Sequence, residues 1–336
     1  VDPESMKSEL QAYLTELNED DIKNIIFNYK ILDYINITPI YEGIQNSNYI
    51  ITTKSKKYIF TIFEDKYVAC NLQKFLGFML FVNKSGFNCP CPITDSNHNL
   101  VSNLNSKPSS LVSFLDGKSL YKHRSSHFAF LGINLAKLHK IALKYPYTIE
   151  KRFDKNFYNS TINGNLKIIE NYNLNLITIF KNSLFAYKNL NSTNLPTGII
   201  HGDLFPDNVL FNKGNIGGFI DFYYASKDYL ISDIAIIIIS WCFNAKSYNK
   251  IELNMNKVRI LLSNYDKIRK ITLNEISSLS IICKIYCIRF FLTRLLDKNS
   301  QKDSKKVLTK DPNEYIHKLL YFNNNTINFE QVINND

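Results

Sequence analysis

The most constraining feature of this sequence is the segment HGDLFPDNVLF at residues 201–211, which is followed by GFIDF at residues 218–222. Gly, Asp, Asn and Pro favour turns, so an isolated Asp and Asn would indicate only a loop. Here Asn208 follows Asp203 by five residues, and Asp221 comes after a β-type run. This joint pattern is much more specific than turn composition, and it predicts a functional loop beside short strands.

These three side chains have the chemistry that metal-assisted phosphoryl transfer requires. The reaction needs an oxygen that orients the attacking hydroxyl group, and hard oxygen ligands for a Mg²⁺ ion that bridges the nucleotide phosphates. We therefore predict that Asp203 is the base and that Asn208 and Asp221 are the metal ligands.

The first third of the chain contains most of the β-type patterns. Tyr49–Thr53 and Tyr58–Phe63 are rich in β-branched and aromatic residues, and the polar residues between them predict a β-hairpin. A further strand is predicted over Leu111–Leu115, before Asp116 and Gly117. Apolar spacing predicts helices over residues 10–17, 20–29 and 67–84.

After Gly117 the patterns are mostly helical. Leu131, Leu135 and Leu138 have helical spacing. Residues 160–190 are Asn-rich and ambiguous, but Leu166, Ile169 and Tyr172 suggest a helix there. Two short strands are predicted within residues 199–222 and several helices within residues 228–296, whereas the last 40 residues are polar without strong periodicity.

We therefore predict an α+β chain with two lobes. The N-lobe, residues 6–116, is small and β-rich with an antiparallel sheet, and the C-lobe, residues 117–336, is larger and mainly helical. Residues 1–5, which precede Met6, are interpreted as an expression-tag remnant.

The catalytic pattern resembles that of the aminoglycoside phosphotransferase superfamily, whose members are small-molecule kinases with a protein-kinase-like fold. The resemblance implies that Asp203 is the catalytic base, that Asn208 and Asp221 bind Mg²⁺, and that His201 is a structural member of the loop. It also matches Asp233 to the Asp that braces this loop, the alternative being a helix N-cap. The segment 131–139, which ends in His139, resembles a helix early in the C-lobe, although such a His is usually a core residue.

Further motifs resemble the bacterial homoserine kinases of this superfamily, over roughly residues 38–320. They are EGxxNSNY at 42–49, FTIFE at 60–64, IDFYYA at 220–225, CIRFFLTRL at 287–295 and DP at 311–312. This resemblance implies ATP-dependent phosphorylation of the hydroxyl of L-homoserine to O-phospho-L-homoserine in threonine biosynthesis, with ATP and Mg²⁺ as cofactors.

The same motifs supply candidate binding residues. Gly43 allows close backbone approach, and a turn with Asn and Ser presents N–H groups to phosphate oxygens, although an ordinary hairpin is the alternative. We expect nucleotide contacts from Gly43, Asn46, Ser47, Asn48, Thr61, Phe114 and Leu115. We expect substrate contacts from Asp207, Tyr223, Arg289 and Arg294.

The N-lobe departs from kinases in general. The third strand should carry a Lys that contacts the phosphates and pairs with a helix Glu, but Thr61 occupies that position and no Asp or Glu occurs between Asp65 and Asp95. Lys57, on the same strand face as Thr61, and Lys66 are candidate replacements, and the role stays unassigned.

Homoserine requires a cation for its carboxylate, and Arg289 or Arg294 would supply a bidentate clamp. The alternative for each is a surface or interlobe ion pair.

Rival functions are an aminoglycoside, choline or methylthioribose kinase, or a non-catalytic nucleotide-binding module. Basic residues outnumber acidic ones from Trp241 to Asp336, which disfavours a polycationic substrate.

Composition limits the partners and the compartment. The net charge is +10, but the basic residues are scattered, so we predict a soluble protein without a nucleic-acid partner. The six cysteines include no Cys-x-x-Cys pair and no secretory signal opens the chain, which predicts reduced thiols and a cytoplasmic location. The longest apolar run, Ile234–Phe243, is far shorter than the roughly 20 residues of a membrane span.

His123 and His127 have metal-site spacing, but we expect solvated histidines. The sequence does not indicate an oligomeric state.

Overall fold

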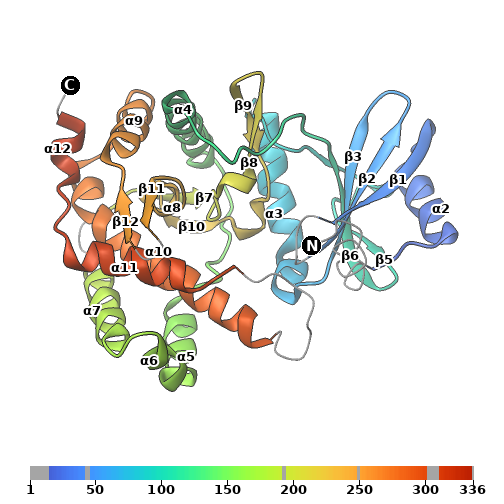
Figure 1. The fold of residues 1–336 in the computed structure, drawn as a ribbon. Helices are drawn as coiled ribbons and strands as arrows, with labels where there is room; N and C mark the ends of the chain where they lie inside the picture. Colours follow the sequence, from blue (N-terminus) through green and yellow to red (C-terminus); the bar gives the residue numbers. More distant parts are fainter. Residues whose placement is uncertain (1–14, 42–45, 191–193, 248–249, 301–309, 335–336) are drawn as a thin grey trace. The chain divides into compact units, whose positions relative to one another are not determined.

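The computed structural model describes residues 15–41, 46–190, 194–247, 250–300 and 310–334, and these residues form two compact units (Figure 1). The first unit holds the described residues up to Asp116 together with Gly218–Tyr223. The second unit holds Gly117–Gly217 and the described residues from Tyr224 onward. Each unit is considered by itself below.

The first unit is built on an antiparallel sheet with the strand order β1-β2-β3-β6-β4, and β5 pairs with β6. The predicted hairpin is formed by β2 and β3, with Tyr49 opposite Phe60. The strands are β1 (Tyr34–Ile40), β2 (Asn46–Thr53), β3 (Lys57–Phe63), β4 (Pro92–Ile93), β5 (Ser102–Leu104) and β6 (Lys107–Ser113).

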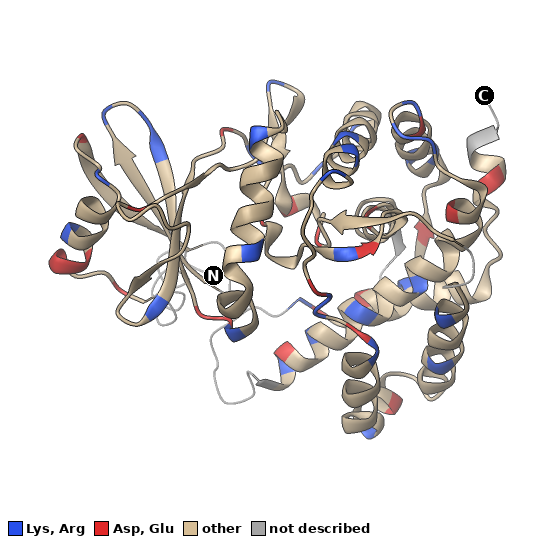
Figure 2. Ribbon diagram, turned by 180° about the vertical axis from the view of Figure 1, so that it is seen from behind, with Lys and Arg blue, Asp and Glu red and all other residues tan. Residues whose placement is uncertain are grey.

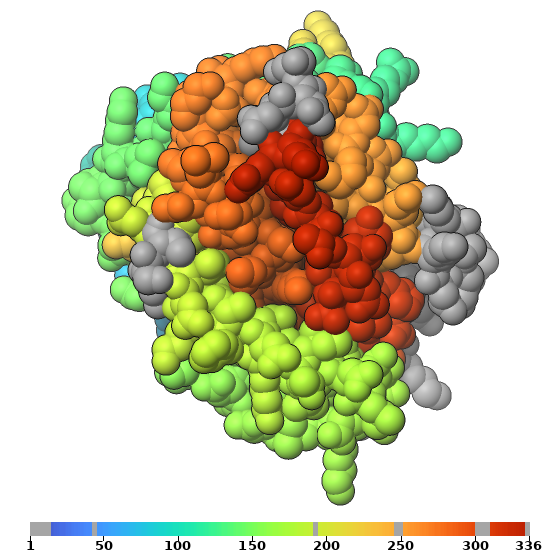
Figure 3. Space-filling view, turned by 90° about the vertical axis from the view of Figure 1, so that its left-hand side faces the viewer, coloured from blue at the N-terminus to red at the C-terminus, as the bar shows by residue number. Residues whose placement is uncertain are grey.

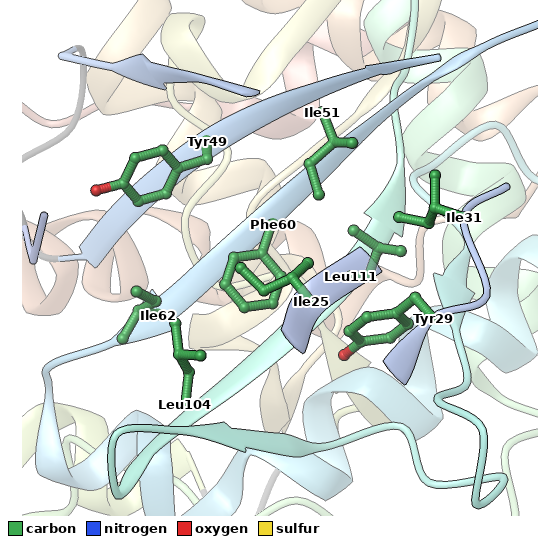
Figure 4. Packing of buried hydrophobic residues seen from close by; sticks show 9 residues of the cluster. All are labelled: Ile25, Tyr29, Ile31, Tyr49, Ile51, Phe60, Ile62, Leu104 and Leu111. Atoms are coloured by element: carbon green, nitrogen blue, oxygen red, sulfur yellow. The ribbon is translucent and has the colours of Figure 1, made fainter. Parts of the chain in front are cut away.

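One face of this sheet carries the apolar core of the first unit (Figure 4). Helix α2 (Glu19–Asn28) contributes Ile25, and Tyr29 beyond its end meets Phe60 edge to face at 6.3 Å. Side chains alternate between the faces of a strand. The neighbours Asn48, Thr61 and Ser110 therefore lie on the opposite face.

The residues around Asp221 belong to the first unit because their aromatic side chains pack on α3 (Lys66–Lys84). The ring of Phe222 lies 6.1 Å from that of Phe78, and Tyr223 meets Phe75 at 6.3 Å. Short strand β9 (Asn215–Phe219) leads into this segment.

The second unit is mainly helical, and its strands pair as β7 with β10, β8 with β9, and β11 with β12. Helix α8 is buried along nearly its whole length. The helices are α4 (Ser125–Ala142), α5 (Lys155–Gly164), α6 (Leu166–Tyr172), α7 (Leu176–Asn189), α8 (Ile231–Trp241), α9 (Met255–Asp266), α10 (Leu273–Ser300), α11 (Asn313–Asn324) and α12 (Phe329–Asn334). The strands are β7 (Thr197–Ile200), β8 (Val209–Asn212), β10 (Ser226–Tyr229), β11 (Phe243–Ser247) and β12 (Lys250–Leu253).

The predicted α+β class is confirmed by an antiparallel sheet in one unit and mostly helices in the other. Two features differ from the expectation. The polar C-terminal part forms α11 and α12, which lie at the surface of the second unit in contact with α10 (Figure 3). The strands β11 and β12, which lie within the range predicted to be helical, pair antiparallel. The helix predicted over residues 10–17 falls largely outside the described residues, and 15–17 are not helical.

The basic residues are scattered over the structure (Figure 2), as they are along the sequence. Lys and Arg are spread along many elements of both units (Figure 2). Within the part of the chain that the structure describes, no helix is both long and apolar enough to cross a membrane.

Candidate active site

The segment HGDLFPDN forms a loop between β7 and β8 in the second unit. Gly202 has φ +79°, and a Cβ atom there would lie 2.5 Å from the carbonyl oxygen of Tyr224. Only Gly tolerates both this conformation and this approach. The loop ends in a 3₁₀ turn over Pro206–Asn208, which delivers Asn208 to the start of β8.

Asp233, in the first turn of α8, is bound to the backbone of this loop. Its Oδ2 accepts a 2.8 Å hydrogen bond from the His201 amide, and its Oδ1 accepts one of 2.8 Å from the Gly202 amide. Nε2 of His139 lies 3.0 Å from the same carboxylate, and Nδ1 lies 2.7 Å from the Tyr265 hydroxyl. The helix N-cap is Leu230, so the N-cap alternative for Asp233 does not hold.

Asp233 is fully buried, and it is a carboxylate rather than a neutral acid. Burial raises the pKa of this carboxyl, but the hydrogen bond and the charge of His139 and the Gly202 amide outweigh burial and leave the pKa below its ordinary value. The loop is thus held by an ionised side chain from the core.

Asp203 and Asn208 are in direct contact. Nδ2 of Asn208 donates to the Asp203 carbonyl oxygen at 2.7 Å and to Asp203 Oδ2 at 3.1 Å. This use of the amide nitrogen leaves Oδ1 of Asn208 as the group that can bind a cation. Nδ1 of fully buried His201 accepts from the Asp203 amide at 3.3 Å, a structural contact.

Arg289 and Arg294, both on α10, have different surroundings. Nη1 of Arg289 donates to the Gly202 carbonyl oxygen at 2.6 Å, and Nη2 lies 3.9 Å from Asp203 Oδ1. Nη1 of Arg294 instead donates to Glu314 at 2.7 Å, and its guanidinium lies over the Tyr315 ring. Arg294 therefore forms an ion pair with Glu314, and both residues belong to the second unit.

Asp207 is also paired with a cation. Its Oδ2 accepts a 3.0 Å bond from Nζ of Lys310, which lies over the ring of Phe205. Both charged groups are exposed. The sequence patterns did not indicate Lys310, because the contact joins segments that are far apart along the chain.

Asp221 and Tyr223 lie in the first unit. Asp221 has φ +64°, a left-handed conformation that is costly for a residue with a Cβ atom and that clusters at functional sites. Tyr223 packs edge to face on Phe63 at 4.9 Å.

The candidate nucleotide residues of the first unit lie on both faces of the sheet. The Thr61 hydroxyl donates to Asn48 Oδ1 at 2.7 Å. Ser47 is fully buried on the opposite face, where its hydroxyl oxygen accepts from the Thr15 amide at 2.9 Å. Oδ1 of Asn46 accepts from the Glu64 amide at 3.3 Å. Gly43 lies outside the described residues.

Phe114 and Leu115 follow β6 and are partly exposed. The Phe114 amide donates to the Lys57 carbonyl oxygen at 3.1 Å, and Nζ of Lys57 lies 5.7 Å from the Phe114 ring centroid.

The expectation of solvated histidines at 123 and 127 was wrong. The ring centroid of His123 lies 4.4 Å from that of Trp241. His127 is buried, and its ring centroid lies 4.7 Å from that of Phe211. Burial lowers the pKa of both imidazoles. Among the described residues, no group of three or more His, Cys, Asp or Glu side chains is arranged so that it could hold a metal ion.

The chain is similar to known proteins over most of its length. The model of the phosphotransferase enzyme family matches residues 36–257. The homoserine kinase of Sinorhizobium fredii is 32% identical over 310 residues, which are 92% of this chain and 94% of that protein. The homoserine kinase of Rhodospirillum rubrum is 32% identical over 92% of this chain and 95% of that protein.

The chain therefore belongs to the phosphotransferase enzyme family. Within that family it groups with the homoserine kinases.

Solved structures share the fold at much lower identity. The amicoumacin kinase hAmiN, in complex with AMP-PNP, Ca²⁺ and Ami, has a TM-score of 0.68 at 13% identity and covers 100% of this chain and 98% of its own. The choline kinase LicA from Streptococcus pneumoniae has a TM-score of 0.63 at 17% identity and covers 91% of this chain and 99% of its own.

Proposed function

We propose that this chain is a kinase that transfers the γ-phosphoryl group of ATP to the hydroxyl of L-homoserine and forms O-phospho-L-homoserine, a step of threonine biosynthesis. The observation that carries this proposal is the catalytic loop. Asp233 orders its backbone, and Asp203 and Asn208 are in contact within it. The similarity to homoserine kinases over 92% of the chain supports this choice of acceptor.

Asp203 would orient the acceptor hydroxyl and receive its proton as the oxygen attacks phosphorus. Its side chain is 19% exposed, so a small alcohol can reach it. A positioned carboxylate of this kind contributes mainly by orientation and proton acceptance.

Asn208 and Asp221 are proposed to hold Mg²⁺. Both offer hard oxygen donors, and Asn208 presents its Oδ1 because Nδ2 is bonded to Asp203. Asp221 keeps a left-handed backbone that its neighbours must stabilise. The metal would supply positive charge beside the nucleotide phosphates.

The nucleotide is proposed to contact the Asn48–Thr61 pair, the backbone near Gly43 and Asn46, and the Phe114–Leu115 strand end. Buried Thr61 and half-buried Asn48 form a polar pair in the sheet, where kinases in general carry a Lys. Asp207 and Tyr223 remain proposed substrate contacts, and a carboxylate such as Asp207 suits the ammonium group of homoserine. We also propose a cytoplasmic location, consistent with the free thiols of all six cysteines.

A coupled assay of ADP release tests this function. Homoserine, choline, methylthioribose and kanamycin are compared as acceptors at saturating ATP and Mg²⁺. We expect homoserine to give the highest kcat/KM. Preferential turnover of another acceptor would assign the chain to that substrate, and the absence of ADP release with every acceptor would identify the non-catalytic alternative.

A further inference from the structure

The guanidinium of Arg289 is enclosed by aromatic rings within the second unit. Its Cζ atom lies 4.4 Å from the ring centroid of Phe153 and 4.6 Å from that of Phe290. The rings of Tyr224 and Tyr286 lie 5.3 and 5.6 Å away. Arg289 is 5% exposed, so this cation is stabilised by ring faces in place of water.

The polar contacts of this cation lead to the catalytic loop. Nη1 donates to the Gly202 carbonyl oxygen at 2.6 Å, and Nη2 lies 3.9 Å from Asp203 Oδ1. Nε is buried and has no hydrogen-bond partner among the described residues. Burying a charge is costly unless it is paired. The loop therefore supplies the partners that make this burial tolerable.

Helix α10 is itself anchored beside this cation. The Tyr286 hydroxyl, one helical turn before Arg289, donates to Asp228 at 2.8 Å. Asp228 also forms an ion pair with Lys151. The position of the guanidinium is thus fixed by a polar network as well as by the rings.

We infer that Arg289 is a positioning residue that fixes the orientation of the Asp203 carboxylate, an inference that rests on the function proposed above. Gly202 is held at its amide by Asp233 and at its carbonyl oxygen by Arg289. Asp203 has one oxygen bonded to Asn208 and the other facing Arg289. Both the backbone and the carboxylate plane of the base are therefore constrained.

This arrangement differs from the carboxylate clamp expected from the sequence. A clamp needs two N–H groups on one edge of the guanidinium. Nη1 is engaged with Gly202, Nε is buried, and Nη2 faces Asp203, where a substrate carboxylate would meet a like charge. Arg289 should therefore affect turnover more than homoserine binding.

The test compares steady-state kinetics of the full chain and its Arg289→Lys variant with homoserine. Lys keeps the charge but loses the planar fork. We expect kcat to fall about ten- to a hundred-fold, as for the loss of one charge-assisted hydrogen bond. The KM for homoserine and the Kd for ATP should change less than about three-fold, a change well below 1.4 kcal/mol.

Two further variants keep the test decisive. Phe153→Leu leaves Arg289 in place but removes one ring that fixes it, and should lower kcat with KM unchanged. Arg289→Ala should regain turnover when guanidinium ion is added at millimolar concentration, whereas methylammonium should not restore it. The matched control is Arg294→Lys on the same helix, a buried Arg whose partner is Glu314, which should retain wild-type kcat and KM.

Three results would overturn the inference. One is a rise in the KM for homoserine at unchanged kcat in Arg289→Lys, which would identify a carboxylate clamp. The second is wild-type kinetics in both Arg289→Lys and Phe153→Leu, and the third is failure of guanidinium to restore Arg289→Ala. Turnover of homoserine by the wild type is measured before any variant is compared. If the wild type does not phosphorylate homoserine, the proposed function is wrong, and the inference about Arg289 is not what has failed.

Discussion

His139 and Asp233 form a fully buried pair in which Nε2 of the imidazole lies 3.0 Å from Oδ2 of the carboxylate. The two residues come from α4 and α8, and the same carboxylate accepts the amides of His201 and Gly202. The conformation of the catalytic loop therefore depends on the packing of two core helices.

Asp233→Asn is expected to destabilise the chain and to impair turnover. An amide offers one acceptor oxygen where the carboxylate offers two, so one loop amide loses its charge-assisted bond. This loss should cost about 1.5–3 kcal/mol of unfolding free energy, measured by urea denaturation. Asp20→Asn, which removes an exposed ion pair with Lys23, is the control and should cost less than about 1 kcal/mol. Equal stability of Asp233→Asn and the wild type would contradict the role of this carboxylate.

Gly202→Ala is expected to abolish most turnover. The new Cβ atom would lie 2.5 Å from the carbonyl oxygen of Tyr224, and the φ of +79° is already unfavourable for Ala. Gly214→Ala is a matched control, because Gly214 has φ +84° with nothing within 4 Å of its Cβ position. Steady-state kinetics should show normal kcat for Gly214→Ala and a drop of about a hundred-fold or more for Gly202→Ala, as when a positioned catalytic group is lost. Similar kcat values in both variants would show that the close approach at Gly202 is unimportant.

Asp221→Ala and Asn208→Ala should weaken binding of Mg·ATP. Each would remove a proposed oxygen ligand, and the effect should be larger for Asp221 because a carboxylate binds a dication more strongly than an amide does. The Mg²⁺ concentration for half-maximal turnover is the measurement, taken at saturating ATP. An unchanged Mg²⁺ dependence in both variants would reject the metal site.

Glu314 gives a prediction for the pH dependence of stability. Burial raises the pKa of this carboxyl, but the charges of Lys318 and Arg294 outweigh burial and lower it to about 2. A carboxyl whose pKa is depressed in the folded state stabilises the fold above its unfolded pKa, about 4.3 for Glu. That contribution should be lost as the pH falls from there toward about 2. Urea midpoints of Glu314→Gln should therefore decline less than those of the wild type over this range. A parallel decline in both proteins would show that Glu314 is not responsible.

Local patterns predicted the elements whose spacing or composition is unambiguous. Tyr49–Thr53 and Tyr58–Phe63 are recognisable as a hairpin, and Leu131, Leu135 and Leu138 mark the buried face of α4. Helix α11 was not predicted, although its buried Tyr315, Leu319 and Phe322 have helical spacing.

The contact between Asp203 and Asn208 was predictable because the two residues are close in the sequence. The surroundings of Arg289 were not, because the rings around it come from segments near residues 153, 224 and 286–290. Such contacts form only when distant elements pack together. The pairing of Asp207 with Lys310 has the same origin.

The measurement that tests the account most directly is phosphorylation of L-homoserine by the wild type and Asp203→Asn, with the product followed by ³¹P NMR. The wild type should form one O-phospho-L-homoserine for each ADP released. Asp203→Asn should bind ATP normally but lower kcat by about a hundred-fold or more, the range expected for a lost general base. Near-normal turnover in Asp203→Asn, or no phosphohomoserine from the wild type, would contradict the account.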